Sequence, residues 1–375
     1  MKKLKISKEF SYIGIADIIG GGIATGFWFY LAILISPEKY GEITYYVGIA
    51  TLVAYIATLG TQNTIAVYAA KAVNIQSTLY FISLIAGAIS SLILVIIFYR
   101  IDVSLLVLGY IINILAIGDL IGRKLFKNYL KYILIQKILV LVLGLGSYFV
   151  FGSDAIIIAL GLTYVGFTVI IYKGLRKSKL DFKLLRSKFG FIFNNYIINA
   201  VGTLAQIDKL LIAPLFGFMI LGNYNLATQA VSMMMIPSKV VFKYILAKDV
   251  EKVNIDRIKK TLIFVSIIIT VIGIIVSPTA ISIIFPKYND AVQAIQIMIL
   301  DVIPGTIIII YTSEFLGIEK SRYLLTSTAI GLATSILGII ILGYQFGIIG
   351  LAATIVLSSY SQVAYMAYVK HYLNM

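Results

Sequence analysis

The chain has 375 residues, of which 60% are hydrophobic and 13% are charged, and its mean hydropathy is +1.00. Soluble globular proteins carry about 25% charged residues, and a soluble core could not hide this much apolar surface. The net charge of +15 does not indicate a nucleic-acid-binding protein, because the basic residues fall in short gaps between apolar runs instead of forming one exposed patch. The composition therefore predicts a polytopic membrane protein.

Apolar runs follow one another along the whole chain. A run of about 20 residues is long enough to cross the bilayer as an α-helix, and a helix satisfies its own backbone hydrogen bonds in lipid. We therefore expect an all-α polytopic membrane protein with about twelve transmembrane helices. The helices are predicted near residues 10–35, 43–69, 78–98, 103–121, 129–151, 154–172, 190–216, 223–246, 261–285, 290–311, 323–342 and 346–369.

The basic residues give the orientation of these spans. With the spans placed as above, 25 Lys and Arg residues lie on the side that holds both termini, and 3 lie on the opposite side. Cytoplasmic connections carry the excess of Lys and Arg in membrane proteins. We therefore expect a multi-pass protein of the plasma (inner) membrane with both termini in the cytoplasm.

The longest polar interruption is the segment 173–189, with seven basic residues and one acid, Asp181. It divides the predicted spans into six and six. We therefore predict an N-terminal lobe over residues 1–172, a basic cytoplasmic linker over 173–189 and a C-terminal lobe over 190–375. Its positive charge is explained by its cytoplasmic position, and a contact with anionic lipids is the alternative interpretation.

Polar side chains recur at helical spacing inside several predicted spans. Such side chains normally face the interior of a helix bundle or a wet cavity. Hydrogen bonds between helices would explain a single Thr or Ser, whereas a whole polar stripe favours a water-filled cavity. The residues that we assign to this predicted substrate cavity are Asn195, Asn199, Gln206 and Lys209 of the seventh span, Asn225 and Gln229 of the eighth, Gln62 of the second and Lys137 of the fifth.

Three acidic residues also lie within predicted spans, namely Asp17, Asp208 and Asp301. Asp17 is followed by Gly20–Gly22, which predicts a loosened helix or a close approach by a neighbour. Asp301 precedes Pro304 by three residues, so we expect the backbone hydrogen bonding to be interrupted there. Each acid could bind a coupling cation, and the alternative is a structural ion pair or a protonated, hydrogen-bonded carboxyl.

The sequence predicts one local ion pair and excludes one class of metal site. Asp119 and Arg123 lie four residues apart at a predicted helix end, which favours a local ion pair. The chain has no cysteine and one histidine, His371, so it cannot build a His/Cys metal site. We expect no metal and no cofactor.

The two halves show a faint internal similarity. Gly41 lies in the turn that opens the second predicted helix, and Gly222 occupies the corresponding turn before the eighth helix. Both turns face the outer side. Parallel repeats of this kind are common in transporters that rock two lobes around a central site.

Several turns together resemble a known family. The resemblance lies in Tyr40-Gly41, in Asp208–Ile212 leading into Leu221–Ala227, in Phe285–Tyr288, and in Phe346–Thr354. They are similar, in the same order, to turns of the polysaccharide-biosynthesis (O-antigen, lipid-linked oligosaccharide) flippases of the multidrug/oligosaccharidyl-lipid/polysaccharide exporter superfamily. The resemblance implies two six-helix lobes that alternate between inward- and outward-open states. It also implies a polyprenyl-linked oligosaccharide as substrate.

These observations predict a flippase that moves a lipid-linked glycan from the cytoplasmic to the outer leaflet. A sugar headgroup would lose its water in hydrocarbon, so the cavity amides would replace those hydrogen bonds, and Lys137 and Lys209 would offset phosphate charge. The expected partners are the lipid-linked glycan, membrane lipids and other glycan-assembly membrane proteins, and no nucleic acid.

Two alternatives belong to other functional classes. A cation-coupled multidrug antiporter of the same superfamily would use Asp17 and Asp301 as a compact acidic site. A membrane glycan polymerase or ligase would need catalytic residues on a sizeable outer loop, and the predicted outer loops have about seven residues or fewer. We therefore expect a protein that is not an enzyme.

Overall fold

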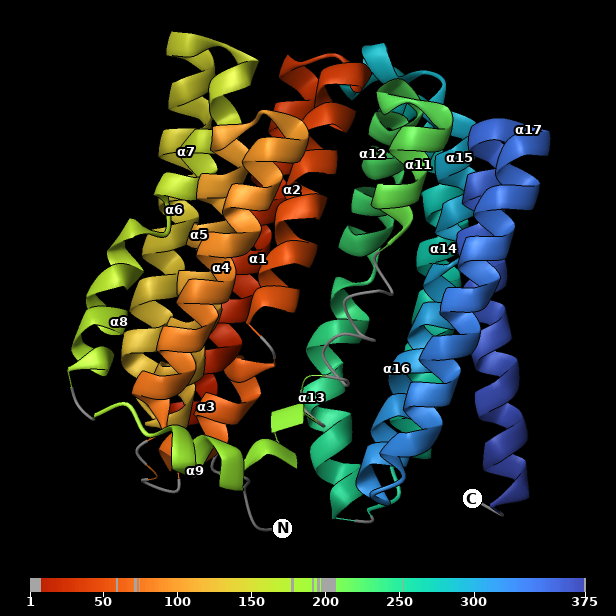
Figure 1. Cartoon of the computed structure of the whole chain (residues 1–375). Helices are drawn as coiled ribbons and strands as arrows, with labels where there is room; N and C mark the ends of the chain where they lie inside the picture. The colour runs from red at the N-terminus through yellow and green to blue at the C-terminus, as the bar shows by residue number, and fades with distance from the viewer. Residues whose placement is uncertain are drawn as a thin grey trace. The chain divides into compact units, whose positions relative to one another are not determined.

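The computed structural model describes residues 8–58, 60–70, 73, 75–176, 179–190, 192–193, 196, 207–251 and 253–373. Within these ranges every regular element is an α-helix or a short 3₁₀ turn, and no strand occurs (Figure 1). The predicted all-α fold class is confirmed.

Eight described helices are long and apolar enough to cross a membrane, or nine if the bent pair α2–α3 counts as one span. The other predicted spans lie in helices that are merged, broken or only partly described. The 52-residue helix α17 (Ser321–Tyr372) contains the last two predicted spans, on either side of Gly347, whose φ of +57° interrupts the helix. The eighth span consists of α12 (Phe218–Met234) and α13 (Ile236–Val250), and α11 (Asp208–Phe216) is the described end of the seventh. The predicted twelve-helix architecture is confirmed.

The chain splits into two compact units by its internal contacts. Unit 1 comprises residues 1–27 and 46–203, and unit 2 comprises residues 28–45 and 204–375. The hairpin 28–45, which joins the first two helices, is thus part of unit 2. Helices α1 (Lys8–Leu34) and α2 (Pro37–Ala57) each contribute to both units.

Unit 1 is built around α5 (Ile101–Gly122), which contacts α3, α4 and α7. Small residues allow the closest of these contacts: a Cβ on Gly118 would lie 2.7 Å from the Gln62 carbonyl oxygen, and one on Gly122 would lie 2.6 Å from that of Ala66. Because lipid is as apolar as a side chain, such close packing is a main source of helix association in membranes. The other elements of unit 1 are α3 (Thr61–Ala70), α4 (Gln76–Phe98), α6 (Phe126–Phe151), η1 (Ser153–Ala155), α7 (Ile156–Leu162), η2 (Val165–Phe167), α8 (Thr168–Leu175) and α9 (Phe182–Ser187).

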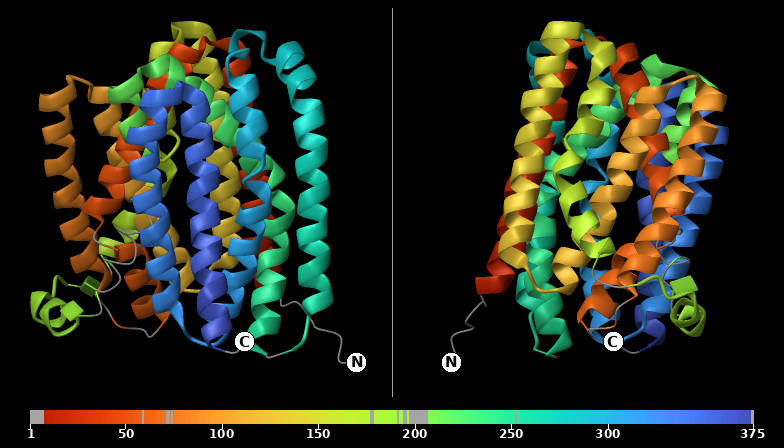
Figure 2. Two further views of the ribbon diagram at one scale, coloured as in Figure 1. Left: turned by 90° about the vertical axis from the view of Figure 1, so that its right-hand side faces the viewer. Right: turned by 60° about the vertical axis from the view of Figure 1, so that its left-hand side comes forward.

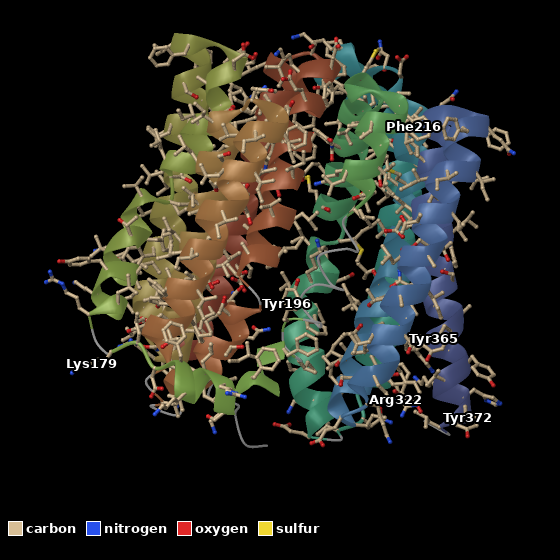
Figure 3. All side chains as sticks on the ribbon, in the orientation of Figure 1. Lys179, Tyr196, Phe216, Arg322, Tyr365 and Tyr372 are labelled. Carbon is tan, nitrogen blue, oxygen red and sulfur yellow. The ribbon has the colours of Figure 1, made fainter. Side chains whose placement is uncertain are left out.

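Unit 2 packs α15 and α16 against α12, α13, α14 and α17. Phe216 lies near one end of this unit, and Arg322 and Tyr372 lie at the other (Figure 3). One predicted span is broken in the middle: α15 ends at Ile299 and α16 begins at Val302. The break confirms the interruption predicted from Pro304, which has no N–H to donate to the carbonyl group of Leu300. The remaining elements of unit 2 are α14 (Asp256–Ile284), η3 (Pro286–Tyr288), α15 (Ala291–Ile299) and α16 (Val302–Gly317).

The hairpin 28–45 is held in unit 2 by residues from the motifs that the sequence singled out. Tyr40, fully buried, packs edge-on against Tyr288 at a centroid distance of 6.1 Å. Lys287 donates to the Leu34 carbonyl oxygen at 2.9 Å, which places a positive charge at the C-terminus of α1. Two motif-bearing turns that are far apart in the sequence thus meet in unit 2.

Gly41 and Gly222 form the closest approach between α2 and α12. A Cβ on Gly41 would overlap the Phe218 carbonyl oxygen, and a Cβ on Gly222 would overlap the Pro37 carbonyl oxygen. The two contacts are reciprocal, because Gly222 corresponds to Gly41 and Phe218 to Pro37 at the same offset of 181 residues. Thr44 and Asn225, which form a hydrogen bond, are separated by this offset as well. The faint sequence match therefore corresponds to a self-complementary contact between repeat-related helices.

Each unit also contains a buried network of charged and polar side chains. In unit 1 Arg123 donates to Asp119 at 2.6 Å and to Gln76 at 2.6 Å, while Gln76 donates to Asp119 at 2.9 Å. This confirms the predicted local ion pair and adds a third member from α4.

The network of unit 2 joins α13, α14, α16 and α17. Lys259 bridges Asp249 at 2.7 Å and Glu314 at 2.9 Å, and Glu314 also binds Lys370 at 2.7 Å. Ser313 donates to the second oxygen of Asp249. Two acids and two bases balance one another, so this network is a structural clamp.

Gly222→Ala should lower the midpoint temperature of unfolding by several degrees, because a methyl group has no room against Pro37 and overpacking costs about 1–3 kcal/mol. The measurement is thermal unfolding of the purified protein in detergent. Gly146→Ala is the matched control, since nothing lies within 4 Å of a Cβ at that helical position. Equal midpoints for the two variants would contradict the close contact.

Glu314→Gln should destabilise the protein much more than Glu251→Gln. Removing one member of a buried ion pair costs about 3–5 kcal/mol, whereas Glu251, whose side chain is 49% exposed, forms a surface pair worth about 0–1 kcal/mol. Chemical denaturation in detergent, followed by circular dichroism, compares the two. A similar loss in both variants would show that the clamp is not a buried network.

Candidate functional site

Two of the three acids predicted from the sequence come together around one tyrosine in unit 2. Asp208 is the first residue of α11, Asp301 immediately precedes α16, and Tyr224 is the buried centre of α12. The Tyr224 hydroxyl donates to Asp208 Oδ2 at 2.6 Å, and Tyr224 also interacts electrostatically with Asp301. We call Asp208, Tyr224 and Asp301 the acidic centre.

Helix ends explain why carboxylates are placed here. The unpaired N–H groups at a helix N-terminus carry a partial positive charge that stabilises an acid in the first turn. Asp208 begins α11, which follows a turn at Ile207, and Asp301 lies in the break before α16. Both acids thus occupy positions where the fold itself offsets part of the cost of a charge in the membrane.

The acidic centre has unused hydrogen-bonding capacity. Ser359 of α17 lies close to the Asp301 carboxyl group. The Oδ1 atoms of Asp208 and Asp301 are nevertheless buried, and neither has a hydrogen-bond partner among the described residues. A buried carboxylate oxygen is costly without a partner, so the centre is suited to take up a proton or a small cation.

The acidic centre is a pair of carboxylates and not a multidentate metal cluster. No group of three or more His, Asp or Glu side chains that could hold a metal ion occurs in the part of the chain that the structure describes. Neutral oxygens would have to complete any cation's coordination. The hydroxyl oxygens of Tyr224 and Ser359 are the neutral oxygens near the two carboxylates.

The sequence predicted the acids of this centre but missed Tyr224 and Ser359 as site residues. Tyr224 lies within the motif Leu221–Ala227, which was a signal for the family resemblance only. Ser359 comes from the last helix, and no spacing rule relates it to Asp301. Only the packing of α17 beside the α15–α16 break brings them together.

The structure describes only some of the predicted cavity residues of the seventh and eighth spans. Asn195, Asn199 and Gln206 lie outside the described residues. Lys209 and Gln229 are half-buried, and neither side chain forms a hydrogen bond or ion pair with a described residue. Their role toward a substrate stays a prediction.

Asn225 is engaged in helix packing. It is 2% exposed and donates to Thr44 Oγ1 at 2.7 Å, and Thr44 in turn donates to the Tyr40 carbonyl oxygen at 2.9 Å. Its amide therefore ties α12 to the hairpin 28–45 in this structure. Contact between Asn225 and a substrate remains a prediction.

In unit 1, the predicted residues Asp17 and Lys137 lie along the contact between α1 and α6. Tyr129 donates to Asp17 Oδ1 at 3.0 Å. Two turns further along α6, the aliphatic part of the Lys137 side chain packs against Gly20. A Cβ added to Gly20 would lie 3.5 Å from Lys137 Cγ. The close approach predicted from Gly20–Gly22 is thus present at Gly20, while nothing lies within 4 Å of a Cβ on Gly21 or Gly22.

Lys137 is an intramembrane cation without a counter-ion in the described structure. It lies in the middle of α6, which is one of the candidate membrane spans, and it is half-buried. No described residue forms an ion pair with it. Gln62, the other cavity residue predicted in unit 1, is half-buried on α3 and forms no side-chain hydrogen bond with the described residues.

A second polar cluster of unit 1 was missed by the sequence reasoning. Tyr110 packs edge-on against Tyr164 at a centroid distance of 5.3 Å, and Thr51 and Tyr55 lie close to Tyr110. One turn from Tyr110, Asn113 Oδ1 is buried without a partner among the described residues. Asn113 lies in a strongly apolar span, so a single amide there gave no periodic signal.

Comparison with solved structures identifies the fold. The chain is similar to a multidrug resistance MATE family transporter of the MOP superfamily in its inward-facing conformation, with a TM-score of 0.69, 14% identity and 98% of each chain covered. The outward-facing conformation of such a transporter gives a TM-score of 0.68 at 14% identity, covering 98% of this chain and 96% of that one. The lipid II flippase MurJ, in an inward closed conformation, gives 0.62 at 16% identity, covering 97% of this chain and 82% of that one.

These likenesses establish that the chain has the fold of MOP superfamily transporters. No protein-family model and no curated protein matches the sequence. At 14–16% identity the solved structures define the fold and leave the substrate open. The neighbours are transporters and not enzymes.

Tyr224→Phe should destabilise the protein by about 1–3 kcal/mol, because Asp208 Oδ2 would lose its hydrogen bond and become a second buried carboxylate oxygen without a donor. Thermal unfolding in detergent measures the loss. Tyr344→Phe is the matched control, since the Tyr344 side chain is 64% exposed. If both variants unfold at the wild-type temperature, the Tyr224–Asp208 bond does not stabilise unit 2.

Proposed function

We propose that this protein is an alternating-access transporter that moves the headgroup of a polyprenyl-linked oligosaccharide from the cytoplasmic to the outer leaflet. The observation that carries the transport proposal is the acidic centre, because each of its two carboxylates keeps one buried oxygen that no described residue partners, and a bound proton or cation would offset the cost of burying it. The MOP transporter fold supports the same conclusion at the level of architecture.

The acidic centre is proposed to couple transport to a proton or a small monovalent cation. With both carboxylates ionised, two negative charges interact through a medium of low dielectric constant, and adding one positive charge relieves that repulsion. The centre joins α11, α12, the α15–α16 break and α17. Its occupancy can therefore bias the packing of four helices, and a ligand shifts an equilibrium only through such a difference between states.

The proposed glycan substrate rests on Lys137 and Lys209. Lys137 lies in the middle of α6, where a charged residue costs about 2.5–3.5 kcal/mol, and neither lysine has an ion pair with a described residue. A phosphate or diphosphate on the substrate would supply the missing negative charge. Lysine offers a point charge and not a bidentate contact, which suits a headgroup that must be released on the other side.

The predicted lobes are proposed as the moving parts. In this view residues 1–172 and 190–375 alternate about the substrate, and the basic linker 173–189 stays on the cytoplasmic side with both termini. The distribution of 25 and 3 basic residues supports this orientation, and a plasma-membrane location is part of the proposal. Asp17, hydrogen-bonded by Tyr129, is proposed as a second coupling carboxylate in unit 1.

A cation-coupled antiporter of drugs or other small molecules is the second candidate. The acidic centre favours it directly, because an acidic site that exchanges a cation for a cationic substrate needs no phosphate-binding lysine. The two candidates differ in what Lys137 does. It is essential to a flippase for phosphate-bearing lipids and dispensable to an antiporter of cations.

The test reconstitutes the purified protein in vesicles and follows lectin access to a lipid-linked oligosaccharide from outside. The wild type should accelerate access over empty vesicles, and a proton or sodium gradient should increase the rate. Lys137→Gln should slow flipping about tenfold or more, since it removes a charged contact with phosphate. Lys239→Gln, an exposed lysine in a predicted span, should leave the rate unchanged.

A second variant separates coupling from substrate binding. Asp301→Asn should abolish the gradient dependence, whereas Asp290→Asn, at an exposed position at the very start of the predicted span 290–311, should preserve it. Absence of acceleration across several candidate lipids would contradict the flippase. Gradient-driven efflux of a cationic dye that survives Lys137→Gln would establish the antiporter instead.

A further inference from the structure

The outward face of α14 combines a basic groove with an apolar stripe. In the left view of Figure 2, α14 stands as the turquoise helix at the edge of unit 2. The first two turns of its exposed face form a shallow groove with a volume of about 460 Å³, lined by Arg257, Lys260, Thr261 and Phe264. The exposed stripe continues along the helix with Ile267, Ile268, Val271, Ile272, Ile275 and Val276.

Helical spacing separates the charges of the first turns into two sets. Arg257, Lys260 and Phe264 are three or four residues apart in succession, so they share one face. Lys259 points the other way, into the clamp, where it binds Asp249 and Glu314. The clamp thus uses one cation of this segment, and the other two remain on the outer face.

The cations of the groove have no counter-ion within the described structure. Neither Arg257 nor Lys260 forms an ion pair with a described residue. The nearest acid in sequence, Asp256, accepts a hydrogen bond from the Asn254 side chain at 3.2 Å. The groove therefore presents two positive charges that no described residue pairs.

The apolar stripe is long enough to accompany an acyl chain through one leaflet. From Phe264 to Val276 the helix rises about 18 Å at 1.5 Å per residue, and half of a typical hydrocarbon core is about 15 Å. Phe264 itself is 62% exposed. A lipid whose acyl chain lies along this stripe would carry its phosphate at the level of Arg257 and Lys260.

We propose that the α14 groove binds the headgroup of an anionic phospholipid from the leaflet on the basic side of the protein. The Arg257 guanidinium would donate two hydrogen bonds to phosphodiester oxygens, and Lys260 would add a point charge. Thr261 already donates to the Arg257 carbonyl oxygen at 2.8 Å, so its hydroxyl is available as an acceptor for a headgroup hydroxyl. A choline headgroup would instead bring a third positive charge to a groove with no acidic lining residue.

This inference does not depend on which substrate is transported. The groove lies on the exposed side of α14, away from its neighbours in unit 2, whereas the acidic centre is formed by α11, α12, α16 and α17. The proposed lipid would bind next to the clamp, because the groove and Lys259 both lie in the first turns of α14.

The test measures lipid binding to the full-length protein by native mass spectrometry in detergent, with phosphatidylglycerol and phosphatidylcholine of the same acyl chains as probes. The wild type should bind phosphatidylglycerol more tightly than phosphatidylcholine. The double variant Arg257→Gln/Lys260→Gln should bind phosphatidylglycerol about 30-fold more weakly, since each basic residue near a membrane surface contributes about fivefold. Its affinity for phosphatidylcholine should not change.

Two further variants keep the proposal falsifiable. Lys127→Gln/Lys131→Gln removes the same charge from an exposed pair on α6 and should leave lipid binding at the wild-type level. The charge-conserving Arg257→Lys/Lys260→Arg should retain the preference for phosphatidylglycerol, which excludes a folding defect as the cause of any loss. Soluble glycerophosphate should compete only weakly, because it lacks the acyl chain. Equal losses in the α14 and α6 variants, or no loss in either, would overturn the proposal.

Discussion

A polar side chain inside a bilayer cannot be solvated by lipid, so it has to find its partner within the protein or in something the protein binds. This constraint organises the described structure. Most intramembrane polar groups are satisfied locally, as when Thr51 donates to the Val47 carbonyl oxygen, or between helices, as when Asn225 donates to Thr44. Where charges are buried, they are balanced, as in the clamp around Lys259 and Glu314.

The exceptions to this pattern are few and carry the functional argument. Asp208 and Asp301 each keep one buried oxygen without a described partner, although Tyr224 and Ser359 are within reach of the centre. Lys137 carries a charge that no described residue neutralises. In a structural network every charged group has a partner within the protein, whereas a site that binds and releases a charged ligand has unpaired groups when the ligand is absent. The acidic centre differs in this respect from the clamp of unit 2.

Helix breaks and glycines place these groups. The break at Leu300 and Asp301 frees a helix N-terminus beside an acid, and α11 offers a second one at Asp208. At the hairpin 28–45, the reciprocal contact of Gly41 and Gly222 brings repeat-related helices together with no side chain between them. The two helices therefore approach closely enough for Asn225 to donate to Thr44 at 2.7 Å.

The sequence alone determined the fold class and the membrane spans, because spans obey a one-dimensional rule: each needs enough consecutive apolar residues to cross the bilayer. It also determined the Asp119–Arg123 pair and the interruption at Pro304, which depend on neighbours three or four residues away. The tertiary structure decided everything that joins distant segments. It alone placed Tyr224 between Asp208 and Asp301, joined Ser359 to Asp301, engaged Asn225 in packing and left Arg257 and Lys260 on an outer face. The periodicity of a helix shows which of its residues share a face. It does not show which other helix packs against that face, and that neighbouring helix supplies the contacts of a side chain inside the membrane.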